Sequence, residues 1–281
     1  MSDTLLVLDM DYLSHRAFYA TGDLEFRGNK TGIVYGVLRE ILNLQERFHT
    51  NRIAFAWDSG DPIRREIYPA YKLNRQHFNL DPQDGENRRQ MRKQMYALRT
   101  EYLQEIGFRN VFYQDGYEAD DVVASICLNL PLNTSAIVVS SDQDLYQLLN
   151  HKVSMWNPAK KALIDEKSFT SFHKIEPARW HLVKAMAGCT SDNVKGIPGI
   201  GEVLAARFLQ GEIKEDSKVH RKVIDGESIW KKNLPVVKLP FPGTRVFGLR
   251  EDEVTRKGWR SVCNNLGLRT VLHQAIGVVL K

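Results

Sequence analysis

Short apolar runs alternate with amphipathic stretches over the first 160 residues of the chain. Four of these runs have the length of a β-strand, at residues 4–9, 53–58, 111–113 and 136–142. Apolar residues recur at three- and four-residue spacing over 34–48 and 86–106, which predicts helices there. Two more helices are predicted after residues 118 and 144. Strands that alternate with helices predict an α/β fold with a mostly parallel central sheet flanked by helices.

The length of the chain, 281 residues, is enough for two domains. We expect an α/β domain over residues 1–175 and a second, mainly helical region over 176–281. The composition, 43% hydrophobic and 26% charged, is that of an ordinary globular protein. The apolar runs are far shorter than the ~20 residues of a membrane-spanning helix, and the N-terminus lacks the basic region of a secretion signal.

The chain contains three cysteines, Cys127, Cys189 and Cys263, and no CxxC pair. This pattern favours neither a disulfide scaffold nor a zinc site, and it fits the reducing cytoplasm, where we place the protein.

Aspartates follow three of the four predicted strands. Asp9 ends the first run, Asp58 the second, and Asp142 the fourth, with Asp144 two residues further on. The carboxyl ends of parallel strands meet at one edge of the sheet, where α/β proteins place their sites, so these side chains should converge. Each aspartate alone could be a turn or helix N-cap residue, but that interpretation is weak for the set.

The segment GYEADDVVAS, residues 116–125, places Glu118, Asp120 and Asp121 at the start of an apolar helix. Acids stabilise a helix N-terminus by only about 0.3–1 kcal/mol each, so a solvated helix start is an incomplete explanation for three neighbouring carboxylates. With the strand-end aspartates, at least seven carboxylates would share one cleft, and such a cluster needs protons or cations. Carboxylates without His or Cys pairs favour Mg²⁺ or Mn²⁺, and two such ions suit displacement at phosphorus.

The segment 64–99 is strongly basic, with nine Lys and Arg residues against four acids. Its middle part is polar and lacks a strong apolar period, which predicts a mobile loop before the helix that follows Glu86. A basic segment beside an acidic cleft suits a phosphodiester substrate. For Arg88, Arg89 and Lys93 the alternative is a solvated helix face. The net charge of +5 indicates a polyanionic partner only weakly.

The segment GCTSDNVKGIPGIG, residues 188–201, predicts a tight turn that opens onto a helix. Backbone N–H groups of such a turn can bind phosphate without reading sequence. The residues proposed for this contact are Lys195, Gly196, Gly199 and Gly201. An ordinary Gly/Pro turn between helices is the alternative.

Taken together, these motifs resemble the 5′-nuclease family, over about residues 1–205. That family includes bacteriophage 5′-exonucleases, flap endonucleases and the 5′-nuclease domain of bacterial DNA polymerase I. The segments that carry the resemblance are LLVLDMDYLSHRAFYA, FAWDSGDPIRREIYPAYKLNR, GYEADDVVAS, SSDQDLYQLL and GCTSDNVKGIPGIG. The resemblance implies a PIN-like 5′-nuclease fold with a helical arch at about 70–105. It also implies a DNA-binding helix–three-turn–helix at about 180–210.

The resemblance also implies roles for individual residues. The implied ligands of up to two Mg²⁺ or Mn²⁺ ions are Asp9, Asp58, Glu118, Asp120, Asp121, Asp142, Asp144 and Asp192. Lys72, Arg64 and Arg75 would face the scissile phosphate, Arg16 would lie near substrate phosphates, and Tyr71 would stack on a base. A K⁺ ion held by carbonyls is implied at the helix–three-turn–helix.

The function implied is that of a metal-dependent, structure-specific 5′-3′ exonuclease or flap endonuclease in DNA replication or repair. Its partners would be DNA with a 5′ end or 5′ flap, and RNA–DNA hybrids during primer removal. We expect a monomer that does not associate with membranes.

The chain departs from the family at Cys189, where an aspartate of the second-metal group is usual. A thiol is a poor ligand for Mg²⁺, so our hypothesis is a weak second metal site, with Mn²⁺ more effective than Mg²⁺. Two alternative functions remain: a structure-specific nucleic-acid-binding protein with weakened catalysis, and a ribonuclease of a related small nuclease fold. Asp11 is either a further ligand or, as we favour, a turn residue.

Overall fold

The protein is described from a computed structural model, which covers residues 3–74 and 82–278. A sheet of six strands forms its centre, in the order β5-β4-β1-β6-β7-β8. The strands are β1 (Asp3–Asp9), β4 (Ile53–Ala56), β5 (Val111–Phe112), β6 (Thr134–Val139), β7 (Val153–Asn157) and β8 (Ala162–Ile164). All neighbouring pairs are parallel except β7 and β8. The predicted α/β fold with a mostly parallel sheet is therefore confirmed.

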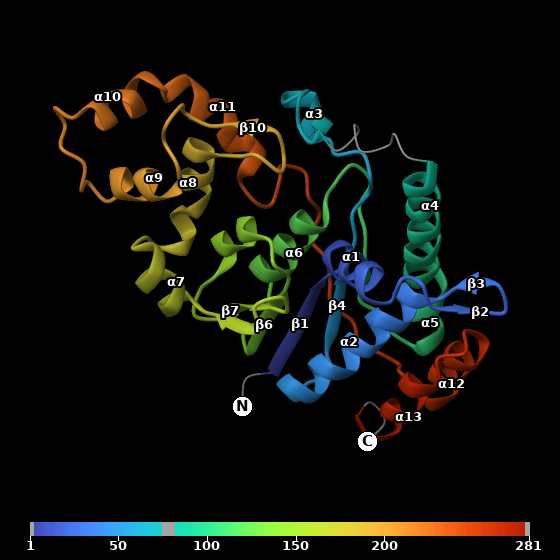
Figure 1. The fold of residues 1–281 in the computed structure, drawn as a ribbon. Helices are drawn as coiled ribbons and strands as arrows, with labels where there is room; N and C mark the ends of the chain where they lie inside the picture. The colour runs from blue at the N-terminus through green and yellow to red at the C-terminus, as the bar shows by residue number, and fades with distance from the viewer. Residues whose placement is uncertain (1–2, 75–81, 279–281) are drawn as a thin grey trace.

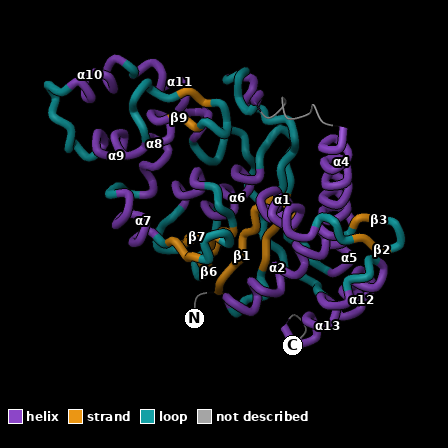
Figure 2. The backbone as a smooth tube through the Cα atoms, in the orientation of Figure 1, coloured by secondary structure: helices purple, strands orange, loops and turns teal. Residues whose placement is uncertain are grey.

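The central strand β1 is buried on both faces because its side chains alternate between two cores. Leu5 and Val7 pack in the core that contains α6 (Ala119–Leu128). Leu6 and Leu8 pack in the opposite core with α1 (Met10–Thr21) and α2 (Gly32–Phe48). This placement explains why TLLVL is continuously apolar rather than alternating. Helices cover both faces of the sheet, as Figure 2 shows.

The predicted helix at 86–106 is longer and less regular than expected. It comprises α4 (Pro82–Ala97), a π-helical turn, η2 (Leu98–Tyr102), and α5 (Leu103–Ile106). A short helix, α3 (Arg64–Ile67), precedes the predicted loop, and residues 75–81 of that loop lie outside the described part of the chain. The residues after Asp142 form a 3₁₀ helix, η3 (Gln143–Leu148), in place of the start of an α-helix. Two short strands, β2 (Glu25–Phe26) and β3 (Asn29–Lys30), form a hairpin between α1 and α2.

The segment after residue 165 is mainly helical and lies in two places (Figure 1). Its first elements gather at one end of the molecule: α7 (Glu166–His173), η4 (Pro177–Arg179), α8 (Trp180–Ala187), β9 (Gly188–Cys189), β10 (Val194–Lys195), α9 (Glu202–Leu209), α10 (Lys218–Asp225) and α11 (Glu227–Val237). Its last two helices, α12 (Arg256–Asn265) and α13 (Arg269–Val278), pack against α5 and α2 at the other end.

An extended connection between α11 and α12 runs along the edge of the sheet. The Arg250 N–H donates to Asn110 Oδ1 at 2.8 Å, and the Glu253 N–H donates to the Gly107 carbonyl at 2.7 Å. At the end of this connection, Trp259 of α12 is fully buried in the same core as Leu6 and Leu8. The C-terminal helices therefore complete one of the two cores of the sheet.

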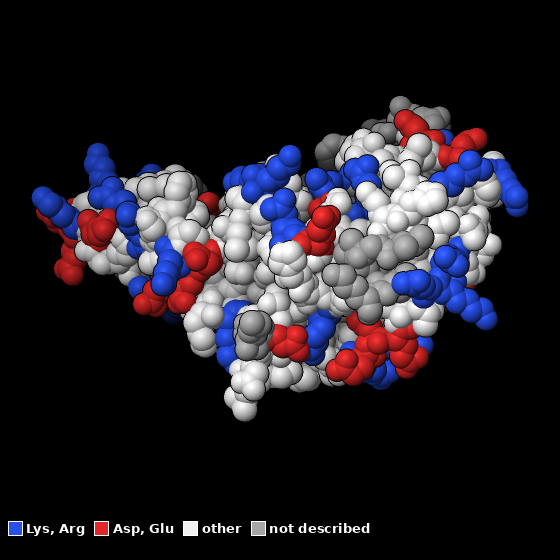
Figure 3. All heavy atoms as spheres, turned by 90° about the horizontal axis from the view of Figure 1, so that it is seen from below, with Lys and Arg blue, Asp and Glu red and all other residues white. Residues whose placement is uncertain are grey.

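Charged side chains are mixed in sign on the face of the molecule from which β1 starts. Figure 3, which views the molecule from below, shows Lys and Arg beside Asp and Glu over much of this face. In the part of the chain that the structure describes, no helix is long and apolar enough to cross a membrane.

Candidate active site

The carboxyl edge of the sheet brings the strand-end aspartates together, as the sequence predicts. Asp9 is both the last residue of β1 and the N-cap of α1. Its carboxylate accepts hydrogen bonds from the Tyr12 N–H at 3.0 Å and from Ser140 Oγ, after β6, at 2.7 Å. Asp58 follows β4 by two residues, and its Oδ1 accepts the Ala119 N–H at the start of α6 at 2.5 Å. Each of these carboxylates thus links its strand to a neighbouring element of the cleft.

Burial of these acids strongly disfavours their charged forms. It raises the pKa of Asp9 to about 7 and the pKa of Asp58 to about 6, and neighbouring carboxylates add to both shifts. The pKa of Asp120 is raised well above its usual range by burial and by Asp142 and Asp9. Since no described residue donates a hydrogen bond to the Asp120 carboxylate, the group of Asp9, Asp58 and Asp120 lacks a full set of partners. A hard cation can balance the negative charge of such a site.

Asp11 supports this cleft from the first turn of α1. Its Oδ2 accepts the Asp58 N–H at 3.0 Å, which fixes the chain where Asp58 leaves the sheet. Burial and the nearby Asp58 raise the pKa of Asp11 to about 8. A turn-stabilising residue is expected to make such a contact, and the choice between this role and that of a further ligand stays a prediction.

Asp121 was predicted to be a metal ligand, but the structure gives its carboxylate another set of partners. The side chain is fully buried. Oδ1 accepts hydrogen bonds from Arg64 Nη2 at 2.7 Å and from the Phe241 N–H at 2.8 Å. Oδ2 accepts from Arg64 Nη1 at 2.6 Å and from the Glu118 N–H at 3.2 Å. Because each oxygen already accepts two hydrogen bonds, Asp121 has no acceptor capacity left for an ion.

Arg64 was predicted to face the scissile phosphate, yet its side chain is only 2% exposed. Its Nε donates to the Val236 carbonyl at 2.9 Å, and Nη1 also donates to Glu118 Oε2 at 2.9 Å. With both Nη atoms on Asp121 as well, four of the five guanidinium N–H groups have partners inside the protein, and the side chain is held away from solvent. Arg64 therefore ties α3 to the start of α6 and the end of α11.

Glu118 sits between this buried pair and the cleft. The Tyr71 hydroxyl donates to Glu118 Oε2 at 2.8 Å, and Lys72 Nζ forms an ion pair with Oε1. Burial alone would raise the pKa of Glu118, but Lys72 and Arg64 lower it below its usual value. Glu118 is therefore an anion in the folded protein.

Tyr71 and Lys72 differ in how far they match the prediction. Lys72 lies at the acids, with Nζ also 3.7 Å from Asp192 Oδ1. Tyr71, which was predicted to stack on a base, is 4% exposed and offers no open ring face in this conformation. Arg75, the third predicted phosphate contact, lies outside the described residues.

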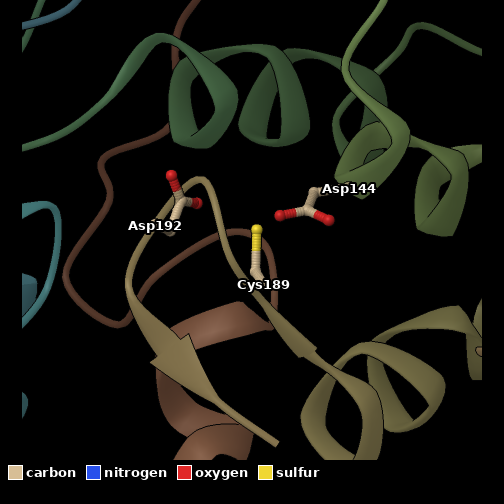
Figure 4. A group of neighbouring side chains, drawn as sticks. All are labelled: Asp144, Cys189 and Asp192. Carbon is tan, nitrogen blue, oxygen red and sulfur yellow. The ribbon is translucent and has the colours of Figure 1, made fainter. Parts of the chain in front are cut away.

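A second group consists of Asp144, Cys189 and Asp192, which converge in Figure 4. One ligand atom from each lies within 4.8 Å of the others. Burial, with Asp192 and Asp144, raises the pKa of the Cys189 thiol to about 11, so the thiol stays protonated. A space of about 10 Å³ is lined by Asp120, Asp144 and Asp192 among other residues, which is roughly the volume that one water-sized probe needs. Asp142, also predicted as a ligand, is exposed and accepts the Asp144 N–H at 2.8 Å.

Sequence reasoning missed Lys184 of α8, which reaches this second group. Its Nζ lies 3.0 Å from Asp144 Oδ1 and 3.2 Å from Glu202 Oε1 of α9. No motif in the sequence signals this contact, because Lys184 lies on a mostly apolar helix.

The predicted nucleic-acid contacts other than Tyr71 lie at three places, namely the turn from β10 to α9, the helix α4 and the helix α1. Lys195 ends β10, and the glycine turn continues to Gly201, the N-cap of α9. Gly199 has a φ of +78°, which glycine adopts without strain. A Cβ at Gly196 would lie 2.1 Å from the Ala187 carbonyl oxygen, so this residue must be small for the turn to pack on α8.

The remaining predicted contacts are on helices away from this turn. Arg89 and Lys93 are exposed on α4, and Arg88 is half-buried there. Arg16 is exposed on α1, 3.4 Å from Glu40 Oε1, and lines a groove of about 720 Å³ between α1, α2 and the β7–β8 turn.

The mostly parallel sheet carries clustered carboxylates and a lysine at its carboxyl edge. This arrangement is that of a nuclease fold with an acidic active site. The family model for the 5′-3′ exonuclease N-terminal resolvase-like domain matches residues 4–174, more than half of the chain. The chain belongs to the 5′-3′ exonuclease family.

Relatives of known sequence agree with this assignment. The 5′-3′ exonuclease of Bacillus subtilis is 30% identical over 269 residues, which cover 91% of this chain and 82% of that protein. DNA polymerase I of Mycobacterium leprae is 32% identical over 247 residues, which cover 80% of this chain. The match spans 25% of the polymerase, so the chain corresponds to one part of that larger protein.

Solved structures share the fold over the whole chain. The T5 5′-exonuclease with bound divalent zinc ions has a TM-score of 0.72 at 19% identity, covering 98% of this chain and 99% of that one. The catalytic core of Rad2 in complex with a DNA substrate has a TM-score of 0.58 at 15% identity, covering 100% and 93%. The PIN-like 5′-nuclease fold expected from the sequence is thereby confirmed.

Proposed function

We propose that the chain is a metal-dependent, structure-specific 5′-nuclease that hydrolyses phosphodiester bonds near the 5′ ends of DNA. The observation that carries the proposal is the group of Asp9, which is buried, and Asp58 and Asp120, which are half-buried; the pKa values of all three are raised, and Glu118 and Lys72 lie beside them. A cluster of this kind has a physical need for divalent cations.

Asp9, Asp58, Glu118 and Asp120 would hold Mg²⁺ or Mn²⁺. Asp58 and Asp120 fit such an ion because Asp58 Oδ2 and both oxygens of Asp120 accept no hydrogen bond from a described residue. Bound ions would lower the pKa of a water and offset the charge that develops on the scissile phosphate. Lys72 would supply a further positive charge at the same place. Tyr71 and Arg64 orient Glu118 through their hydrogen bonds.

The proposal also assigns a role to each of the two parts of the chain. Residues 1–175 would form the nuclease domain, with the helical arch at about 70–105. Residues 176–281 would contribute a helix–three-turn–helix at about 180–210, with a K⁺ ion held by backbone carbonyls. The positive φ of Gly199 and the position of Gly201 at the start of α9 support a turn that presents N–H groups to a phosphate. The substrates would be DNA with a 5′ flap or 5′ end and RNA–DNA hybrids, bound by a cytoplasmic monomer.

The decisive experiment is cleavage of a 5′-labelled flap duplex in the presence of Mg²⁺, Mn²⁺ or EDTA. We expect short 5′ products with either metal and none with EDTA, and the product length distinguishes trimming from junction cutting. Asp120→Asn should abolish cleavage while DNA binding survives. Full cleavage by this variant would refute the assignment.

A second candidate function rests on Cys189, which replaces an expected carboxylate with a neutral thiol. In that case the chain would bind structured nucleic acid with weakened catalysis. Binding without any product under both metals would favour this candidate.

A further inference from the structure

The feature of interest is the ammonium group of Lys184, which lies inside the second group of potential metal ligands. Its Nζ is 3.0 Å from Asp144 Oδ1, and this oxygen accepts no well-aligned hydrogen bond from a described residue. The contact is thus a close ion pair at an otherwise unsatisfied carboxylate oxygen. The Lys184 side chain is 9% exposed, so the charge is largely removed from solvent.

We propose that Lys184 is a tethered cation that takes the place of a second divalent ion at Asp144, Cys189 and Asp192. The inference rests on the proposed metal-dependent function. It means that the chain holds one divalent ion firmly at the group of Asp9, Asp58 and Asp120. A second ion enters only when the ammonium leaves Asp144.

The ligands of the group support this substitution. Asp144 and Asp192 contribute carboxylates, and Cys189 contributes a thiol, which is a poor ligand for Mg²⁺. The Lys184 ammonium lies on one of the two carboxylates, and Lys72 Nζ lies 3.7 Å from Asp192 Oδ1. A Mg²⁺ ion on Asp144 would lie about 2.1 Å from a carboxylate oxygen, within a few ångströms of Nζ, where like charges in a partly buried site repel strongly.

The position of Lys184 is built into the fold. Its neighbours on α8, Val183, Ala185 and Met186, are buried, which fixes the helix and the base of the side chain. Its second partner, Glu202 Oε1 at 3.2 Å, is the first residue of α9. When a second ion displaces the ammonium from Asp144, the ammonium can stay paired with Glu202. Its charge is then not left unpaired in an apolar environment.

The test measures metal binding to the full chain without DNA, by Mn²⁺ titration with electron paramagnetic resonance and calorimetry. We expect one tight and one weak site in the wild type. Lys184→Met should raise the affinity of the weak site by about 10-fold or more, as expected for a group that tunes a metal site from outside its ligand set. Lys184→Arg should behave like the wild type. Lys231→Met, which removes an exposed ion pair to Glu227 on α11, is the matched control and should change neither site.

Cys189→Asp extends the test as a double-mutant cycle with Lys184→Met. The gain in second-site affinity from Cys189→Asp should be larger in the Lys184→Met background than in the wild-type background. Two equally tight sites in the wild type, or no gain in Lys184→Met, would overturn the inference.

A measurement on the unaltered protein covers the case in which Lys184→Met does not fold. A crystal structure in excess Mn²⁺ should show either no second ion or a second ion with Nζ moved away from Asp144. A second ion with Nζ still paired to Asp144 would disprove the substitution. Absence of any tight site, or a tight site that survives Asp120→Asn, would instead refute the proposed function.

Discussion

Replacing Asp121 by asparagine separates a structural role from a metal-binding role, because its neighbour Asp120 provides the contrasting case. Asp121→Asn removes the anion that pairs with both Nη atoms of Arg64. Whichever way the amide is oriented, one of its N–H groups faces a guanidinium or backbone donor. Arg64, with a side chain only 2% exposed, would keep a charge without its main partner.

The size of the effect follows from the burial of this pair. Breaking a buried ion pair by removing one partner costs about 3–5 kcal/mol. For a chain of this length each kcal/mol lowers the melting temperature by about 2–4 °C, so Asp121→Asn should lower it by roughly 6–20 °C. Asp120→Asn should leave the melting temperature of the metal-free protein unchanged or higher, because it removes one charge from a repelling cluster.

Thermal unfolding in EDTA, followed by titration of Mn²⁺, is the assay. Asp120→Asn should lose stabilisation by Mn²⁺ and lose flap cleavage, whereas Asp121→Asn should retain both below its melting temperature. Asp61→Asn, which alters an exposed ion pair with Arg65, is the control and should melt like the wild type. If Asp121→Asn melts like the wild type in EDTA yet is no longer stabilised by Mn²⁺, Asp121 is a ligand and the reasoning is wrong.

Three further predictions concern pH, metal and DNA. Burial raises the pKa of Asp9 to about 7 and of Asp58 to about 6 from 3.8, so the folded state binds more protons than the unfolded state between about pH 4 and pH 7. Metal-free stability should therefore fall as the pH rises through that window, and a melting temperature in EDTA that rises instead would contradict these shifts. Cys189→Asp should lower the metal concentration needed for half-maximal cleavage, most clearly for Mg²⁺; an unchanged midpoint would sink the weak-site hypothesis. Gly199→Ala should weaken duplex binding measured by fluorescence anisotropy, because Gly199 has a φ of +78° and the new Cβ would lie 3.1 Å from Lys222 Nζ. Unaltered binding would show that this turn does not contact the DNA backbone.

The fold was predictable where local pattern and tertiary environment agree. The run TLLVL is apolar throughout because β1 is buried on both faces. The strands β7 and β8 were missed because VSMWN mixes polar and apolar residues and ALI is only three residues long. The convergence of Asp9 and Asp58 followed from the topology of a parallel sheet, which requires no side-chain detail.

The roles of Arg64 and Asp121 could not be read from local sequence. Their charges and their place in family motifs indicated the site, but their burial depends on partners far along the chain. The Val236 carbonyl that accepts from Arg64 lies 172 residues away, and the Phe241 N–H that donates to Asp121 lies 120 residues away. Lys184 was missed for the same reason, because its charge gains meaning only from the position of Asp144.

The packing of α12 and α13 against the sheet has a consequence for how the chain folds during synthesis. Trp259 and Val271, both fully buried, belong to the same core as residues of β1 and α2. On a ribosome the part of this core that α12 and α13 cover would be made early and remain uncovered until residues 256–278 have emerged. Since exposed apolar surface on a partly folded chain promotes aggregation, the nascent protein should depend on chaperones until its last two helices dock.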